Sequence, residues 1–321
     1  MKILEIVTEH AGPFKVLFEV LKDMLTETNI EFRAYPKDID GNDNPNEKDC
    51  MKIVAFDPTK TILINLKLDG SSFTTFTCKK NKFLIGINLS YFYRLIKSMG
   101  KNDILTLSVD HDSKNYLQIK IDSPDEKKDT KVKLKLMDLD ETKMAIPPVE
   151  FGAVITMDSQ EFNKLCREMN SISEYVEIKC IPDKIIFTCK GDVAEKKTTY
   201  THDKQENGLV RICHGHNNNK ESKSEETPEI IQGVFELKSL VLFSKCASLC
   251  EYIEIYMKND FALVIKYTVA TLGRILLCLS PIKESNIDSN KSDDEEFYSD
   301  PELYDEDIEK LDNLELSDEN Q

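Results

Sequence analysis

The sequence predicts an α+β protein with two similar domains in tandem, each with two helices packed on antiparallel sheets. Three observations predict it. Strand-like and helix-like stretches follow the same order in both halves of the 321-residue chain. The segments NLSYFYRLIKSMGKNDILTLSV and ELKSLVLFSKCASLCEYIEIYM repeat one pattern of helix, break and alternating strand. Between the halves lies LKLMDLDETKMAIPPVEF, an acidic stretch whose two prolines cannot continue a helix or a central strand.

The first half begins with an expected strand at 2–8 and a helix that Pro13 opens and that continues to about Leu25. Apolar residues recur along this helix at helical spacing, which indicates one buried face. A second helix of the same kind is expected from about Leu89 to Met99. The other expected segments are a polar insertion at 37–50 and strands at 51–56, 61–67, 72–78, 104–109 and 116–121.

The second half repeats this order. A strand at 152–157 leads into a helix whose N-cap is Asp158 or Ser159. The last helix is expected from about Leu237 to Ala247. A polar loop covers 203–229, and strands are expected at 175–180, 184–189, 196–201, 230–235, 251–257, 261–268 and 273–280.

These elements set the predicted boundaries: a first domain at 1–134, a connector at 135–151, a second domain at 152–283 and an acidic tail at 284–321. The tail holds sixteen Asp and Glu residues against two lysines, so it carries most of the formal net charge of −16. It has too few apolar residues to fold alone, and it is either a solvated appendage or a polyanion that competes with DNA. The two domains together are nearly neutral, so their charge does not exclude DNA binding.

The composition also limits the cellular compartment in which the protein is expected and the class of protein to which it belongs. Nine cysteines lie mostly within apolar runs and form no paired framework, which favours reduced thiols in the cytosol or nucleus. No apolar run approaches a membrane span, and the first residues lack a secretory signal. We therefore expect no membrane association.

No enzymatic motif stands out. Cys213, His214 and His216 have a spacing that suits no common zinc site, which favours a loop role. Asp138 and Asp140 could point the same way on an extended strand, but no third carboxylate accompanies them as a nuclease would require. Phosphate-loop, nucleophile-elbow and HExxH motifs are missing from the sequence. We predict no catalytic residues, no metal site and no cofactor.

Basic residues occur on every predicted helix, on the side away from its apolar stripe or flanking that stripe. A solvated helix face explains any one helix, but the occurrence on all four favours a shared surface for DNA phosphates. These residues are Lys15 and Lys22, then Arg94, Lys97 and Lys101, then Lys164 and Arg167, and finally Lys238 and Lys245.

The connector, with L-M-D-L-D before an Ile-Pro pair, resembles that of the eukaryotic-type sliding clamp, proliferating cell nuclear antigen (PCNA). FEVLKDML, INLSYFYRLIKSMGKNDILTL, EFNKLCREM and LCLSPIK extend the resemblance over about residues 1–283. It implies DNA-clamp domains that assemble head to tail into a homotrimeric ring, with helices inside and sheets outside. The ring would encircle duplex DNA without reading its sequence and act as a non-enzymatic processivity factor. The alternative is a subunit of a heteromeric, clamp-like ring.

The resemblance also implies site residues. The basic helix residues above, together with Lys80, would bind DNA. A client pocket would dock the polymerase, the clamp loader and repair proteins through short peptide motifs. Its lining would be Phe56, Lys60, Leu63, Met144, Ile146, Pro147, Ala262, Ser280 and Pro281. Lys60, Ala262 and Cys278 differ from the family's usual histidine, proline and tyrosine, so the pocket's preference is open.

A head-to-tail ring needs two different, complementary edges. We expect them at the strand Val132–Leu136 and at the strand Ile185–Cys189, and the alternative is that both are interior strands. The interface residues would be Val132, Leu134, Leu136, Ile185, Phe187 and Cys189. The expected location is the nucleus, or the cytoplasmic replication site of a large DNA virus.

Overall fold

The computed structural model describes residues 1–35, 48–141, 149–202, 210–214 and 230–282. The predicted insertion 37–50, polar loop 203–229 and tail 284–321 therefore lie largely outside the described residues, as do Met144, Ile146 and Pro147 of the connector. In the first half the elements are β1 (Lys2–Thr8), α1 (Ala11–Met24), β2 (Glu27–Arg33), β3 (Cys50–Phe56), β4 (Ile62–Asp69), β5 (Thr75–Cys78), β6 (Lys82–Asn88), α2 (Leu89–Ile96), β7 (Ile104–Asp110), β8 (Tyr116–Ser123) and β9 (Lys128–Lys135).

The second half follows the same order. Its elements are β10 (Ala153–Asp158), α3 (Ser159–Asn170), β11 (Tyr175–Ile181), β12 (Lys184–Lys190), β13 (Glu195–Thr201), β14 (Val210–His214), β15 (Ile231–Glu236), α4 (Leu237–Ser244), β16 (Tyr252–Met257), β17 (Leu263–Val269) and β18 (Gly273–Leu279). The predicted α+β class with two similar halves is confirmed.

Three strands were not expected. β2 and β6 pair with each other at the edge of a sheet. Polar residues interrupt the alternation of apolar and polar side chains that identifies a strand. β14 falls within the stretch predicted as a polar loop, where it pairs with β10. The last helix is also shorter than predicted, because α4 ends at Ser244 and a 3-10 turn, Lys245–Ser248, replaces its final turn.

The strands form three antiparallel sheets. Their orders are β5-β1-β7-β8-β9, β14-β10-β16-β17-β18-β4-β3-β2-β6 and β13-β12-β11-β15. The nine-stranded sheet belongs to both halves, because β18 pairs with β4 over the full length of β18. The two domains are therefore joined by a continuous ladder of backbone hydrogen bonds as well as by the connector.

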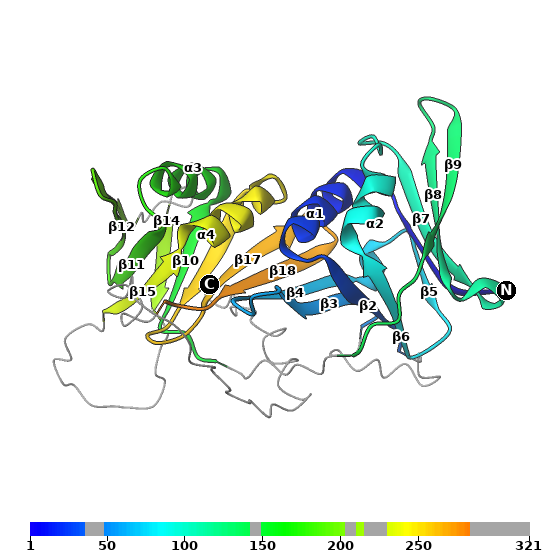
Figure 1. Ribbon diagram of the computed structural model, residues 1–321, viewed down its shortest axis with the longest axis horizontal. Helices are drawn as coiled ribbons and strands as arrows, with labels where there is room; N and C mark the ends of the chain where they lie inside the picture. The colour runs from blue at the N-terminus through cyan, green and yellow to red at the C-terminus, as the bar shows by residue number, and fades with distance from the viewer. Residues whose placement is uncertain (36–47, 142–148, 203–209, 215–229, 283–321) are drawn as a thin grey trace, which may run out of the picture.

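All four α-helices of the described residues lie on one side of these sheets (Figure 1). Each presents an apolar stripe to the core, and on α1 that stripe includes the fully buried Phe14, Leu17 and Phe18. The ring of Phe92 on α2 lies 4.7 Å from that of Phe18, so α1 and α2 pack through their aromatic side chains. α3 and α4 likewise contact each other in the second half. The polar sides of all four helices are left on a single surface.

Side-chain caps fix where two of the helices begin. The Asn88 side chain accepts a hydrogen bond from the backbone N–H of Tyr91 at 3.0 Å, and this starts α2. The Asp158 side chain accepts one from the N–H of Glu161 at 2.8 Å, so Asp158 rather than Ser159 is the N-cap of α3.

The first part of the connector is attached to the edge of the nine-stranded sheet. Met137 makes a bridge with Gly86 of β6, where an added Cβ would lie 2.5 Å from the Met137 carbonyl oxygen, so only glycine fits. Asn29 of β2 donates its amide to the carbonyls of Leu139 and Asp140 at 3.3 and 3.0 Å. These bonds hold residues 137–140 across β2 and β6, on the side of the sheet away from the helices.

Candidate functional site

The polar surface of the four helices, called the helix face below, is the first candidate site. Helices α1–α4 and the turns after α2 and α4 (residues 11–24, 89–101, 159–170 and 237–248) carry nine Lys and Arg residues but only four acids. Seven of these cations are exposed and two are half-buried. The exposed cations are Arg94, Lys97, Lys101, Lys164, Arg167, Lys238 and Lys245, and the half-buried ones are Lys15 and Lys22.

Lys15 connects the two helices of the first half. Its Nζ donates to the carbonyl oxygen of Met99 at 2.7 Å and to that of Lys97 at 3.3 Å. Lys97 is the C-cap of α2 and Met99 lies in the turn after it, where the helix dipole places partial negative charge and a cation is favourable. Lys15 is therefore a structural cap as well as a predicted phosphate contact.

Aromatic side chains on α2 support two further cations. The Arg94 guanidinium lies 5.3 Å from the centre of the Tyr91 ring, and the Lys22 ammonium lies 5.0 Å from that of Tyr93. Such cation–π contacts hold a flexible side chain over one part of the surface. Tyr91 is itself 58% exposed on the helix face, a position that its helical spacing alone does not reveal.

The structure does not bring Lys80 together with the other predicted DNA-binding residues. It lies in the turn before β6, whereas Asn88, at the other end of that strand, caps α2. The strand therefore separates Lys80 from the helix face by about 20 Å. The intervening strand β6 was not predicted from the sequence.

The predicted client residues that the structure describes lie on three neighbouring features. Leu63 and Ala262 pack against an apolar cluster on the sheet side away from the helices, formed by Phe151, Tyr256, Val264, Leu276 and Cys278 and called the outer cluster below. Leu63 and Cys278 are direct register partners on β4 and β18. Burial raises the pKa of the Cys278 thiol to about 12, so it is a neutral, apolar contact at pH 7.

The turn between β3 and β4 places Phe56 and Lys60. Asp57 holds this turn by accepting hydrogen bonds from the N–H groups of Ile62 and Thr59, at 2.7 and 3.2 Å. Burial raises the pKa of the Asp57 carboxyl, but hydrogen bonds from Thr59 and the turn backbone outweigh it and lower the pKa overall. Lys60 adopts a left-handed conformation with φ of 57°, and Phe56 is 43% exposed.

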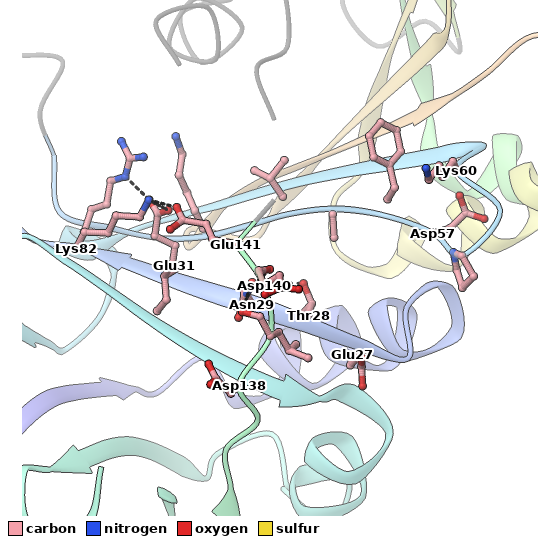
Figure 2. A pocket seen from close by; sticks show the side chains of 18 residues that line it. Glu27, Thr28, Asn29, Glu31, Asp57, Lys60, Lys82, Asp138, Asp140 and Glu141 are labelled. Carbon is pink, nitrogen blue, oxygen red and sulfur yellow. Dashed lines mark hydrogen bonds and ion pairs between the residues drawn. The ribbon is translucent and has the colours of Figure 1, made fainter. Parts of the chain in front are cut away.

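A cavity of about 650 Å³ lies between this turn, β2, β6 and the connector (Figure 2). Phe56 and Lys60 line one end, and the ion pairs of Lys82 with Glu31 and Glu141 lie at the other. Asp138 and Asp140 also line it. Ser280 and Pro281 instead line a groove between the end of α1 and α4. The predicted pocket is thus a set of adjoining surfaces around the turn.

One predicted subunit edge is wrong. β9 is an edge strand as expected, and it contains Val132 and Leu134, while Leu136 follows it. The strand with Ile185, Phe187 and Cys189 is β12, which pairs with β11 on one side and β13 on the other. All three side chains are buried in the core. The edge of that sheet is β13, a strand of polar alternation that the sequence could not distinguish from an interior one.

The other motifs gain no chemical role from the structure. Cys213 is exposed on β14, and the described residues contain no group of three or more His, Cys, Asp or Glu that could hold a metal ion. None of the helices in the described ranges is long and apolar enough to cross a membrane.

Comparison with known proteins agrees with this geometry. Residues 3–143 match the family described as proliferating cell nuclear antigen, N-terminal domain, and residues 145–282 match its C-terminal domain. The chain is 30% identical over 309 residues to a "Probable DNA polymerase sliding clamp" of Acanthamoeba polyphaga mimivirus, covering 89% of this chain and 63% of the viral protein. It is 27% identical over 284 residues to a "Probable DNA polymerase sliding clamp 1" of Paramecium bursaria Chlorella virus 1, covering 87% of this chain and 97% of that protein.

Two paired helical layers on shared antiparallel sheets, with basic residues gathered on the helices, define a protein of the sliding-clamp class. The chain belongs to the proliferating cell nuclear antigen family of DNA polymerase sliding clamps, which are not enzymes.

Proposed function

We propose that this protein is a DNA polymerase processivity factor that assembles as a homotrimeric ring around duplex DNA. The observation that carries the proposal is the helix face: the four helices lie on one side of the sheets, and with the turns after α2 and α4 they carry nine cations and four acids. Flexible lysine and arginine side chains contact phosphates without reading bases, which suits a protein that must slide. Retention on closed circular DNA, and loss when that DNA is linearised, tests the proposal.

The two sheet edges support closure of the ring. β9 ends the five-stranded sheet and β13 ends the four-stranded sheet. Pairing of β9 with β13 of the next copy would satisfy backbone groups on both strands and would be head to tail, because the two edges differ. β13 thereby replaces β12 as the second proposed interface strand.

Both proposed edges are basic. β9 carries Lys128, Lys131, Lys133 and Lys135 with one acid, and β13 carries two lysines with one acid. Like charges on paired edges repel, and salt screens that repulsion. We therefore expect the trimer's dissociation constant to fall about threefold to tenfold between roughly 0.05 and 0.3 M salt.

Native mass measurement over this salt range checks the prediction. DNA binding should weaken over the same range, which separates the two electrostatic effects. A trimer that weakens as salt rises would contradict like-charge repulsion at the edges. A chain that stays monomeric at every salt concentration would instead indicate a subunit of a heteromeric ring.

We further propose that the surfaces around the turn 57–61 dock clients, including the polymerase and the clamp loader, through short peptides with aromatic anchors. Phe56 offers an exposed apolar face at the rim, beside the outer cluster that Leu63 and Ala262 contact. Burial of one aromatic ring against such a face supplies a large share of a peptide's affinity.

Phe56→Ala is expected to weaken binding of such a peptide by about tenfold while leaving the fold intact, because Phe56 is not part of the core. Val193→Ala is the matched control, since Val193 is 99% exposed in the turn between β12 and β13. Isothermal titration with a peptide from the cognate polymerase measures the difference. Equal affinities of the two variants would move the docking surface away from the turn.

The viral relatives support a role at a DNA replication site. We propose the nucleus or a cytoplasmic viral replication site as the location.

A further inference from the structure

Asp23 occupies the point on the helix face where the two halves of the chain meet. Its Oδ1 lies 2.5 Å from Nζ of Lys22, and its Oδ2 lies 2.7 Å from Nζ of Lys245, which is 222 residues away in the sequence. One carboxylate at the end of α1 thus binds two cations, one on its own helix and one on the 3-10 turn after α4.

We infer that Asp23 is a built-in counter-charge that competes with DNA phosphates for Lys22 and Lys245, and so keeps the clamp's hold on DNA loose enough to slide. The inference deepens the proposed function, on which it rests, by assigning a positioning residue to the DNA surface. Asp23 itself would touch no phosphate; it would act through the two lysines.

The surroundings favour an ionised Asp23. Partial burial raises the pKa of its carboxyl, but hydrogen bonds and charge from Lys22 and Lys245 outweigh burial and lower the pKa overall. The Asp23 side chain keeps 27% of its surface exposed, and that of Lys245 keeps 40%. The ion pairs are therefore open to solvent and within reach of a phosphate, which can displace the carboxylate instead of adding to it.

The contact with Tyr93 restrains Lys22 more than the other lysines of the helix face. The Lys22 ammonium lies over the Tyr93 ring of α2 while it binds Asp23, and the Tyr93 hydroxyl in turn interacts with Glu19 of α1. The Lys22 side chain is thus held between α1 and α2, and only 24% of it is exposed. By contrast, Lys97 and Lys238 are exposed on the same face. The helix face therefore has restrained cations at the domain junction and more accessible ones around it.

The test is Asp23→Asn, which keeps the shape of the side chain and removes its charge. Asp122→Asn is the control. Asp122 pairs with Lys120 at 2.8 Å on the more exposed side of β8, and the buried residues of β8 lie on its other side. Both variants change the net charge equally, but only one releases cations on the helix face. Asp23→Glu keeps the charge and serves as the conservative rescue.

Fluorescence anisotropy with a short labelled duplex, measured over a range of salt concentrations, gives affinity and salt slope. Asp23→Asn should bind about threefold to tenfold more tightly at roughly 0.1 M salt, with a slope steeper by about one. Asp23→Glu and Asp122→Asn should resemble the wild type. Slower diffusion of loaded Asp23→Asn rings along DNA should accompany the tighter binding.

Equal affinity and slope for Asp23→Asn and Asp122→Asn would overturn the inference. So would an Asp23→Glu variant that binds as tightly and with as steep a slope as Asp23→Asn. If Asp23→Asn folds poorly by thermal unfolding, Asp23→Ser provides the same loss of charge with a smaller side chain. Failure of the proposed function looks different: the wild type itself would show no salt-dependent binding, and reversal of Arg94 and Lys97 would change nothing.

Discussion

Replacement of Arg94 and Lys97 together by glutamate is expected to lower DNA affinity by about a hundredfold or more at roughly 0.1 M salt. Both side chains are exposed on and just after α2, and neither belongs to the core. The change replaces two attractive charges with two repulsive ones on the surface proposed to face phosphates. Duplex binding, and primer extension by the cognate polymerase with the clamp loader, measure the loss.

The matched control is Lys114→Glu with Lys258→Glu. Both lysines are exposed in turns at the ends of strands β7 and β16 that lie away from the helices. This double variant changes the net charge by the same amount. If it weakens DNA binding as much as the α2 variant does, binding depends on overall charge and the helix face is not the DNA surface.

Disruption of the free edge of β13 is expected to convert the trimer into a folded monomer. Neighbouring residues on a strand direct their N–H groups to opposite sides. The His202 N–H donates to the Asp183 carbonyl, so in this register the Thr198 N–H faces β12 and the Thr199 N–H faces outward. Thr198→Pro therefore removes a bond to β12, whereas Thr199→Pro removes only an outward N–H, since β13 pairs with no other strand in the described part of the chain. The variant that keeps the β12 bond should unfold at nearly the wild-type temperature but lose the ring.

Native mass and circular dichroism distinguish these outcomes. A proline in β5, the other edge of the five-stranded sheet, is the control, because β5 is not a proposed interface. Cys78→Pro should remain trimeric, because the Lys79 N–H donates to the Ile3 carbonyl and in this register the Cys78 N–H faces outward. A folded β13 variant that stays trimeric would exclude this edge from the interface.

Helices and their order could be predicted because they depend on local patterns. The spacing of Phe14, Leu17 and Phe18 identifies a buried face whatever lies opposite, and the cap at Asp158 follows from side-chain chemistry. The repeated order in the two halves then predicted two similar domains.

Edge and interior strands could not be distinguished in the same way. β12 and β13 both alternate, and only their pairing shows that Phe187 is interior and that β13 has a free side. The contact of Asp23 with Lys245 is equally invisible, because it joins residues 222 apart. The separation of Lys80 from α2 is hidden for a related reason, because the number of residues between them says little about distance once an extended strand intervenes.

The most direct test of the central claim is retention on topologically different DNA. The protein is loaded onto nicked circular DNA by the cognate ATP-driven loader, isolated with the circle, and then released or kept after the circle is cut once by a restriction enzyme. A ring that encircles duplex DNA stays on the closed circle and leaves through the ends of the linear molecule. Equal retention on both forms would contradict encirclement and show that the helix face binds DNA, if at all, from one side only.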